Sequence, residues 1–184
     1  MASINSSEHH PLIILIPGEE GRTPARRLRD SVPEGRDAVV LDLGNWDNPH
    51  RNTWVNRLNL AIGRAQRPVE LVADGLACLA VIWWATFEQP GADSPVVRAA
   101  LLSPPDLDRP GTDPRVARFG AVQSVGLPFP ATLVASGRES AALLSTYRRL
   151  AADWDCTYGE WNGEGTVPAH VVARAPRSWP RPRA

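Results

Sequence analysis

One carboxylate, Asp74, stands where the sequence changes from a predicted strand into a predicted helix. The apolar run 69–73 has the length and composition of a buried strand, and the apolar segment that begins at Leu76 is long enough for a helix. The free N–H groups and the dipole of a helix N-terminus favour a negative charge nearby. Asp74 could therefore act as a general acid or base, or it could cap the helix, and the sequence weighs the two roles equally.

The turn itself has the setting of a nucleophile elbow but lacks the nucleophile. Residues 73–77 read Ala-Asp-Gly-Leu-Ala, where the motif G-x-S-x-G would raise a serine above the sheet. The serine position is Gly75, which has no side chain and cannot form an acyl-enzyme. We therefore expect no acyl transfer at this turn, and Gly75 leaves room for a substrate atom near the helix N-terminus.

Predicted strands and helices alternate along the chain, which indicates a three-layer α/β fold with a mostly parallel, doubly wound sheet. We expect one domain over residues 11–184, preceded by a polar, disordered tail over residues 1–10. Residues 104–127 are rich in Pro, Asp, Gly and Arg and predict a long loop that frames a site. The predicted strands are 12–16, 38–43, 69–73, 97–102 and 131–136, and the predicted helices are 23–31, 52–64, the segment after residue 76, and 140–152.

Composition narrows the function classes. The 184 residues carry a formal net charge of +0, so we expect neither nucleic acid nor an anionic membrane as a partner. No apolar run approaches the roughly 20 residues of a membrane span. The run 12–16 lacks the flanks of a signal peptide, and two cysteines make no disulfide framework. These features predict a cytoplasmic protein.

Two kinds of catalysis are not expected. All 20 basic residues are arginine, so a lysine Schiff base is excluded. The four histidines and two cysteines show no close ligand spacing, which predicts no metal site, and we expect no cofactor.

Several short patterns, taken in order, resemble the small serine hydrolases related to retinoblastoma-binding protein 9, a compact α/β-hydrolase group common in bacteria. The resemblance spans nearly the whole chain and implies an α/β-hydrolase-like fold. The patterns are Ile-Pro-Gly at 16–18, Asn-Trp-Asp-Asn-Pro at 45–49, Leu-Val-Ala at 71–73, Leu-Ser-Pro-Pro-Asp at 102–106, Leu-Pro-Phe-Pro at 127–130 and Trp-Pro at 179–180.

The resemblance also implies where a catalytic triad would fall. By position, the serine corresponds to Gly75, and the histidine that commonly precedes it corresponds to Asp74. The acid falls on or near Glu139, within residues 136–139, and the triad histidine corresponds to Thr166, or to His170 if the register shifts. The chain thus resembles a divergent member that lacks the serine and the histidine of the triad.

A second carboxylate makes acid–base chemistry conceivable. In this fold Glu139 would lie with Asp74 at the carboxyl edge of the sheet, and two carboxylates in one desolvated pocket push their pKa values apart. A solvated loop carboxylate is the slightly favoured alternative for Glu139. Glu19 would repel an oxyanion if it pointed into the pocket, although an exposed turn is the commoner place for such a charge.

Three hypotheses remain. The first is a repurposed, non-hydrolytic enzyme that uses Asp74 and Glu139 for isomerisation, cyclisation or elimination on a small apolar molecule. The second is an inactive pseudo-hydrolase that binds a ligand or a protein partner. The third and least favoured is hydrolysis by a relocated nucleophile, for which Ser136 lacks an obvious base and Cys78 packs inward. The sequence identifies neither a substrate nor an oligomeric state.

Overall fold

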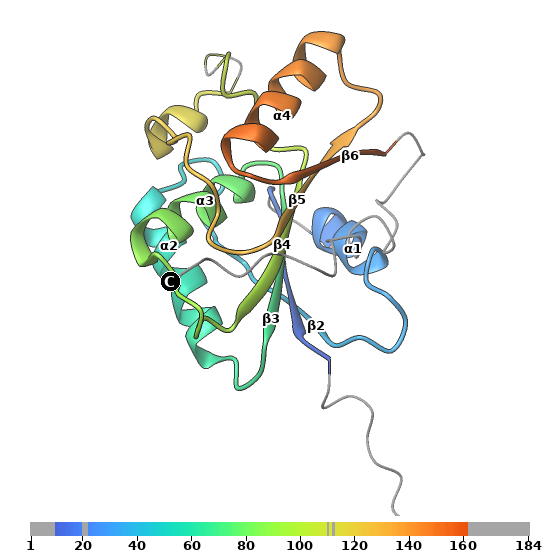
Figure 1. Ribbon diagram of the computed structural model, residues 1–184, viewed down its shortest axis with the longest axis vertical. Helices are drawn as coiled ribbons and strands as arrows, with labels where there is room; N and C mark the ends of the chain where they lie inside the picture. Colours follow the sequence, from blue (N-terminus) through green and yellow to red (C-terminus); the bar gives the residue numbers. More distant parts are fainter. Residues whose placement is uncertain (1–9, 20–21, 110, 112, 162–184) are drawn as a thin grey trace, which may run out of the picture.

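A six-stranded sheet forms the centre of the computed structural model, which describes residues 10–19, 22–109, 111 and 113–161. All neighbouring strands are parallel, in the order β2-β1-β3-β4-β5-β6 (Figure 1). The predicted parallel, doubly wound α/β sheet is therefore confirmed. The strands are β1 (Leu12–Ile16), β2 (Ala38–Val40), β3 (Val69–Asp74), β4 (Val96–Leu102), β5 (Ala131–Ser136) and β6 (Thr157–Trp161).

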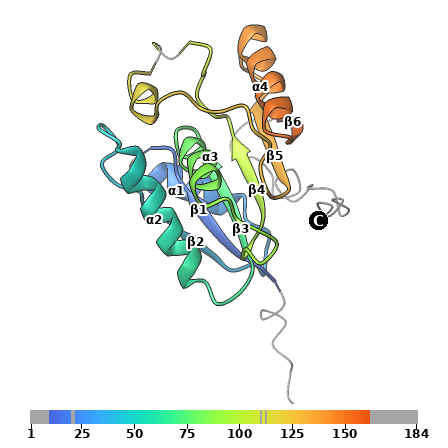
Figure 2. The same cartoon turned by 60° about the vertical axis from the view of Figure 1, so that its left-hand side comes forward.

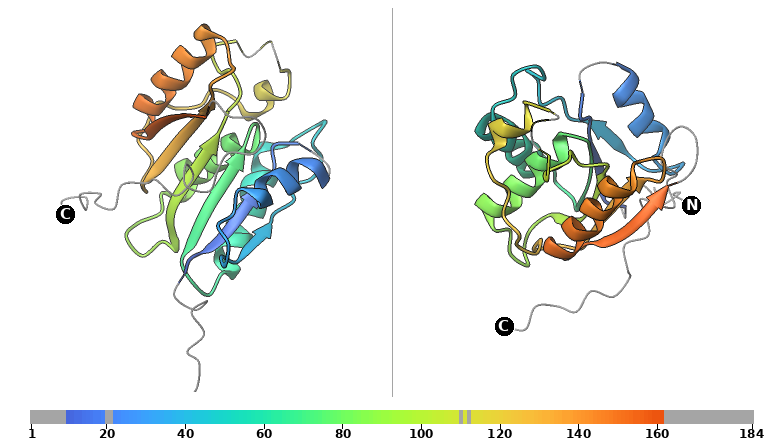
Figure 3. Two further views of the ribbon diagram at one scale, coloured as in Figure 1. Left: turned by 90° about the vertical axis from the view of Figure 1, so that its right-hand side faces the viewer. Right: turned by 90° about the horizontal axis from the view of Figure 1, so that it is seen from above.

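Helices cover both faces of the sheet, with α1 on one side and α2 and α3 on the other (Figures 1 and 3). Helix α4 follows β5 and packs with β5 and β6. Figure 2 shows the short 3-10 helix η3 at the same end of the sheet as α4. The helices are α1 (Arg22–Asp30), α2 (Arg51–Arg64), α3 (Ala77–Glu88), η3 (Val116–Phe119) and α4 (Ala141–Asp153).

Side-chain alternation along the strands produces this three-layer arrangement, because successive residues of a strand point to opposite faces. In β3, Leu71 and Ala73 belong to the apolar core that also contains residues of α2, α3 and α4. Val72 belongs to the second core, together with Leu28 of α1. Helix α3 is buried from Ala77 to Ala85, as its unbroken apolar sequence requires.

The chain order reverses between β1 and β3, and this switch point positions the candidate site. From β1 the chain moves outward to β2 and then returns to β3 on the other side of β1. Connections leaving β1 and β3 therefore diverge to opposite faces, and in open α/β sheets ligands commonly bind at the carboxyl ends of strands at such a point. Residues 17–19 and the turn at residues 74–76 both lie there.

An aromatic cluster fixes η3 beside α2. The buried Trp54 of α2 donates its indole N–H to the carbonyl oxygen of Gly44 at 2.8 Å. Its ring meets Trp46 edge-on at a centroid distance of 4.8 Å and Phe119 of η3 at 5.5 Å. Such edge-to-face pairs add about 0.5–1.5 kcal/mol each beyond area burial. They hold part of the long loop before β5 in a defined place.

Two strands differ from the sequence prediction, one in its end point and one in its existence. The strand expected at 38–43 ends at Val40, and β6 was not predicted at all. Strand β6 contains Thr, Tyr, Gly, Glu and Trp and buries none of them fully, so its sequence carries little apolar signal.

A buried ionic cluster at the opposite end of β3 from Asp74 gives a stability prediction. Glu70 is 7% exposed and pairs with Arg36 at 3.0 Å and Arg98 at 2.9 Å. Glu70→Gln removes the negative charge that compensates two partly buried guanidinium groups, so we expect a loss of about 3 kcal/mol in the free energy of unfolding. Urea unfolding measures the loss.

The exposed pair Asp37–Arg67, with an N–O distance of 2.7 Å, provides the matched control. Asp37→Asn should change the free energy of unfolding by less than about 1 kcal/mol because that pair is largely solvated. Equal losses in the two variants would contradict the distinction.

Candidate active site at the strand-to-helix turn

The turn after β3 has the sharp geometry that its sequence predicts. Gly75 has a φ of +53°, in the left-handed region that glycine adopts without strain. Its N–H donates to the carbonyl oxygen of Leu102 at 2.9 Å, and its own carbonyl accepts the N–H of Cys78 at 3.1 Å. These bonds tie the turn to β4 on one side and to the start of α3 on the other.

The turn after β1 packs directly on this backbone. A Cβ on Gly18 would lie 2.2 Å from the carbonyl oxygen of Asp74 and 3.1 Å from the Cα of Gly75. Residue 18 must therefore be glycine for the two strand ends to approach so closely. By contrast, a Cβ on Gly75 would meet only the Cα of Gly18, at an ordinary 3.8 Å. There is thus room above Gly75 for a side chain or for an atom of a ligand.

The Asp74 side chain is partly buried, and its surroundings disfavour the charged form. Burial, and second the negative charge of Glu19, raise the pKa of Asp74 to about 6. Arg27 and the N–H of Gly75 act in the opposite direction and only partly compensate. Asp74 therefore exists in both protonation states near neutral pH.

Asp74 is not used as a helix cap. Leu76, which is buried, occupies the N-cap position of α3, and no side chain makes a capping hydrogen bond there. The sequence left two roles open for Asp74, a helix cap and a general acid or base. The capping role is not seen in the structure. The N–H groups of Leu76 and Ala77, in the first turn, have no intrahelical acceptor.

Glu139, Asp106 and Asp74 all lie near enough to Tyr147 for their charges to affect its pKa. This tyrosine of α4 is 2% exposed, and burial, followed by the charges of Glu139, Cys78, Asp106 and Asp74, raises its pKa far above the usual range. Tyr147 is therefore held protonated. The charge that acts most on Asp74 itself is that of Glu19, which is exposed after β1.

Two further residues near this end of the sheet, Asp106 and Tyr147, were not candidates from the sequence. Asp106 follows the carboxyl end of β4 by four residues and ends the Leu-Ser-Pro-Pro-Asp pattern at 102–106. Tyr147 lies on the buried face of α4 with Leu150 and Ala151, and its spacing is that of an ordinary core residue.

The two alternative nucleophiles are poorly placed for hydrolysis. Ser136 ends β5, and its Oγ accepts the N–H of Arg138 at 3.5 Å; in the described residues no hydrogen bond links it to a histidine. Cys78 is fully buried, and its Sγ faces the carbonyl oxygens of Ala73 and Leu102. Burial raises the pKa of this thiol well above its usual range, which makes it inert.

The remaining predicted positions, Thr166 and His170, lie outside the described residues. Among the residues that are described, no group of three or more His, Cys, Asp or Glu side chains could hold a metal ion. Within the same part of the chain, no helix combines the length and apolar composition needed to cross a membrane.

The close approach of the two turns predicts strong position dependence of glycine substitution. Gly18→Ala would force its Cβ into the backbone of Asp74 and should lower the free energy of unfolding by several kcal/mol, about 3 or more. Gly63→Ala is the control, because Gly63 lies in helix α2 with nothing within 4 Å of its Cβ position. That variant should gain about 0.5–1 kcal/mol. Thermal or urea unfolding measures both changes in the free energy of unfolding. Similar effects at the two positions would contradict the close contact between Gly18 and the backbone of Asp74.

The raised pKa of Asp74 predicts a specific pH dependence of stability. A carboxyl whose pKa is about 6 when folded and 3.8 when unfolded contributes stability below about pH 4, and this contribution is lost as the pH rises through 6. The shift corresponds to about 3 kcal/mol. Asp74→Asn, which cannot ionise, should therefore be more stable than the wild type at pH 8, with a difference that shrinks toward pH 4.

Urea unfolding of both proteins between pH 4 and 8 measures this difference. Asp93→Asn, at an exposed aspartate, is the control for the removal of one carboxylate. If Asp74→Asn were less stable than the wild type throughout this range, the folded protein would stabilise the charged form of Asp74, and the prediction would be wrong.

Comparison with known proteins agrees with the fold. The model of the serine hydrolase family matches residues 13–181. The ydeN gene product of Bacillus subtilis superposes with a TM-score of 0.63 at 19% identity, covering 89% of both chains. A putative YdeN-like hydrolase from Pectobacterium atrosepticum gives 0.57 at 18% identity, over 91% of this chain and 84% of that one.

An α/β hydrolase from Sphaerobacter thermophilus gives a TM-score of 0.55 at 12% identity, over 90% of both chains. At such identities the likeness shows the fold alone. No curated protein sequence matches the chain. Because the family model covers nearly the whole length, the chain belongs to the serine hydrolase family and has its α/β-hydrolase fold.

Proposed function

We propose that this protein is a non-hydrolytic enzyme in which Asp74 moves a proton on a small apolar molecule without a covalent intermediate. The observation that carries the proposal is the Asp74 carboxyl itself. It stands at the switch point of the sheet, caps no helix, and has a pKa raised to about 6. Perturbed titratable groups at such positions are candidates for catalysis.

The pKa suits a group that both takes and returns a proton. Near neutral pH the ionised form is available to abstract a proton from one substrate atom, and the resulting acid can deliver it to another atom. Such a transfer is balanced with no added reagent for isomerisation or cyclisation, and in an elimination the proton goes to the leaving group. The free N–H groups at the start of α3 would stabilise negative charge that develops on a substrate oxygen above Gly75.

Glu139 is proposed as the second carboxylate. It follows β5 at the same edge of the sheet, and its charge reaches Tyr147, as does that of Asp74. Glu139 and Asp74 together could act on two atoms of one substrate.

Gly75 and the two poorly placed nucleophiles argue against acyl transfer. The negative charge of Glu19 acts on Asp74 itself, because it disfavours the Asp74 carboxylate and so raises the share of the protonated acid. The fold alone does not decide the reaction, since function depends on the site.

Activity-based labelling tests the exclusion of hydrolysis. A fluorophosphonate probe should not label the wild type, and Gly75→Ser should gain no esterase activity on p-nitrophenyl butyrate, although the backbone has space for the side chain. Mass spectrometry and the esterase assay give the answer. Stoichiometric labelling at Ser136 would overturn the proposal, and a clear gain in Gly75→Ser would mean that a base such as His170 is already in place.

Proton exchange tests the role of Asp74 directly. Incubating the protein with apolar ketones and lactones in D₂O should exchange the protons next to the carbonyl group, as followed by NMR. The rate should rise with pH through about 6 and then level off, because the base is the ionised carboxylate. Asp74→Asn should reduce the exchange at least about 100-fold, which is the typical contribution of a positioned acid or base.

Glu139→Gln should reduce the same exchange less, since Asp74 remains. Equal exchange in the wild type and Asp74→Asn would contradict the role of Asp74. Exchange at the protein-free rate in both would leave a protein that binds its ligand without converting it.

A further inference from the structure

A cavity of about 460 Å³ lies between helix α4 and the segment around η3 that precedes β5. Its size is within the range of small-molecule sites, which is about 300–1,000 Å³. Neither Asp74 nor Gly75 belongs to its wall, so the cavity is distinct from the strand-to-helix turn. We call it the α4 cavity, and its wall is formed by Leu107, Val116, Ala117, Gly120, Ala121, Val122, Gln123, Ser124, Arg149, Leu150 and Trp154.

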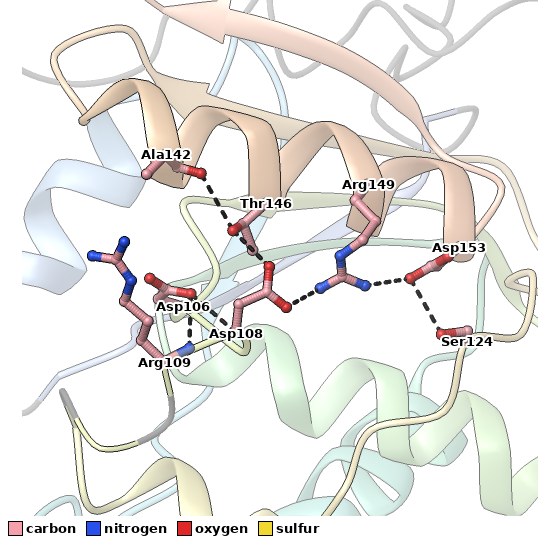
Figure 4. Close-up of polar contacts among 8 residues, drawn as sticks. All are labelled: Asp106, Asp108, Arg109, Ser124, Ala142, Thr146, Arg149 and Asp153. Carbon is pink, nitrogen blue, oxygen red and sulfur yellow. Dashed lines mark hydrogen bonds and ion pairs between the residues drawn. The ribbon is translucent and has the colours of Figure 1, made fainter.

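Among the described residues, Arg149 is the only charged one in this wall, and its charge is balanced by two carboxylates. Its guanidinium donates to Asp108 at 2.5 Å and to Asp153 at 2.6 Å. Figure 4 shows the side chain held between the two carboxylates, one on the loop after β4 and one on α4. Two negative partners leave no net positive charge for an anionic ligand.

Both carboxylates are themselves fixed. Asp108 also accepts the hydroxyl of Thr146 at 2.8 Å, and Asp153 accepts the hydroxyl of Ser124 at 3.2 Å (Figure 4). The two acids therefore lie in a connected network along the rim instead of swinging freely in solvent, which strengthens their hold on Arg149.

Further polar groups of the wall are paired as well. The carbonyl oxygen of Gln123 accepts the indole N–H of Trp154 at 3.3 Å, and the carbonyl of Trp154 accepts the N–H of Leu127 at 2.9 Å. What remains for a ligand is chiefly the aliphatic and aromatic surface of residues such as Val122 and Leu150.

We propose that the α4 cavity binds an uncharged, apolar small molecule, and that Asp108 and Asp153 set this charge preference by occupying Arg149. The inference rests on the proposed function in one respect only, namely that the bound molecule is also the substrate of Asp74. Binding itself is independent of catalysis.

Two probes that differ by one charged group test the charge preference. N-phenyl-1-naphthylamine is neutral, and 8-anilino-1-naphthalenesulfonate is the same ring system with a sulfonate. The neutral probe should bind saturably at one site, and the anion at least about tenfold more weakly, a difference of about 1.4 kcal/mol. Equal affinity for both probes, or no saturable binding of the neutral one, would overturn the proposal.

Trp154 provides a reporter at the wall. It is 1% exposed and lines the cavity, so excitation of tryptophan should sensitise emission of the bound neutral probe. Trp154→Phe should reduce this sensitised emission, whereas Trp46→Phe, at a tryptophan that is not in the wall, should reduce it less. The reverse order would place the probe elsewhere.

A filling variant tests the location by affinity. Val122→Trp should weaken the neutral probe at least about tenfold because the larger side chain occupies the cavity. Ala152→Trp adds the same group to an exposed position of α4 outside the wall and is the matched control. Equal effects of the two variants would overturn the assignment, and circular dichroism checks that both are folded.

The double variant Asp108→Asn, Asp153→Asn tests the role of the two acids. It frees the charge of Arg149 and should raise the affinity for the sulfonate, relative to the neutral probe, at least about tenfold. Adding Arg149→Met should abolish that gain. If the acids only brace the loop, their loss would change both probes alike, and an unchanged affinity ratio would overturn the proposal.

Failure of this proposal can be distinguished from failure of the proposed function. The probe titrations do not depend on turnover, and the pH dependence of proton exchange does not depend on the probes. If Val122→Trp loses probe binding but keeps exchange on the ketones, the cavity binds a molecule other than the substrate.

Discussion

The contact between Gly18 and the backbone of Asp74 is the constraint on which the site depends. The two strand ends meet so closely that a single Cβ at Gly18 would overlap the Asp74 carbonyl oxygen. This approach is possible because β1 and β3 are neighbours in register, with Ile16 opposite Ala73. The turn at Gly75 beside it is left-handed, and within the described part of the chain a Cβ there would have only the Cα of Gly18 nearby, at 3.8 Å. The carboxyl of Asp74 is thereby kept partly away from water without a helix-capping bond.

Such a placement has an energetic consequence. A carboxyl whose pKa is raised is less stable in its charged form when the protein is folded, so Asp74 weakens the fold at neutral pH. Stability would be served by a neutral residue at this position. Glu19 increases the penalty instead of relieving it. Residues that reduce stability in this manner are typical of functional sites, where activity and stability oppose each other.

The sequence could predict the fold and the turn because both leave strong local signals. The continuous apolar run 12–16 is typical of a strand covered on both faces, and the turn after residues 69–73 has a short, recognisable pattern. The raised pKa of Tyr147 could not be predicted, since a buried tyrosine at helical spacing has the same sequence pattern whether or not charged groups lie near it. The α4 cavity was also beyond prediction. Its wall combines residues 107–124 of a loop without periodicity with Leu150 and Trp154 of a distant helix, so no local pattern describes it. The sequence predicted only that the loop over residues 104–127 would frame a site.

The loop that walls the cavity is held at both ends by different forces. At η3 the edge-on packing of Phe119 against Trp54 is apolar, buried and independent of salt. At the rim, Arg149 joins Asp108 to Asp153 at half-exposed positions, where ionic contacts are weaker and screened by salt. The apolar anchor therefore supplies most of the stability of the wall. The ionic network contributes little to stability by comparison, but it determines the charge that a ligand meets there. A division of this kind lets the charge preference of the cavity change through two carboxylates while the fold that holds Asp74 at the sheet edge stays as it is.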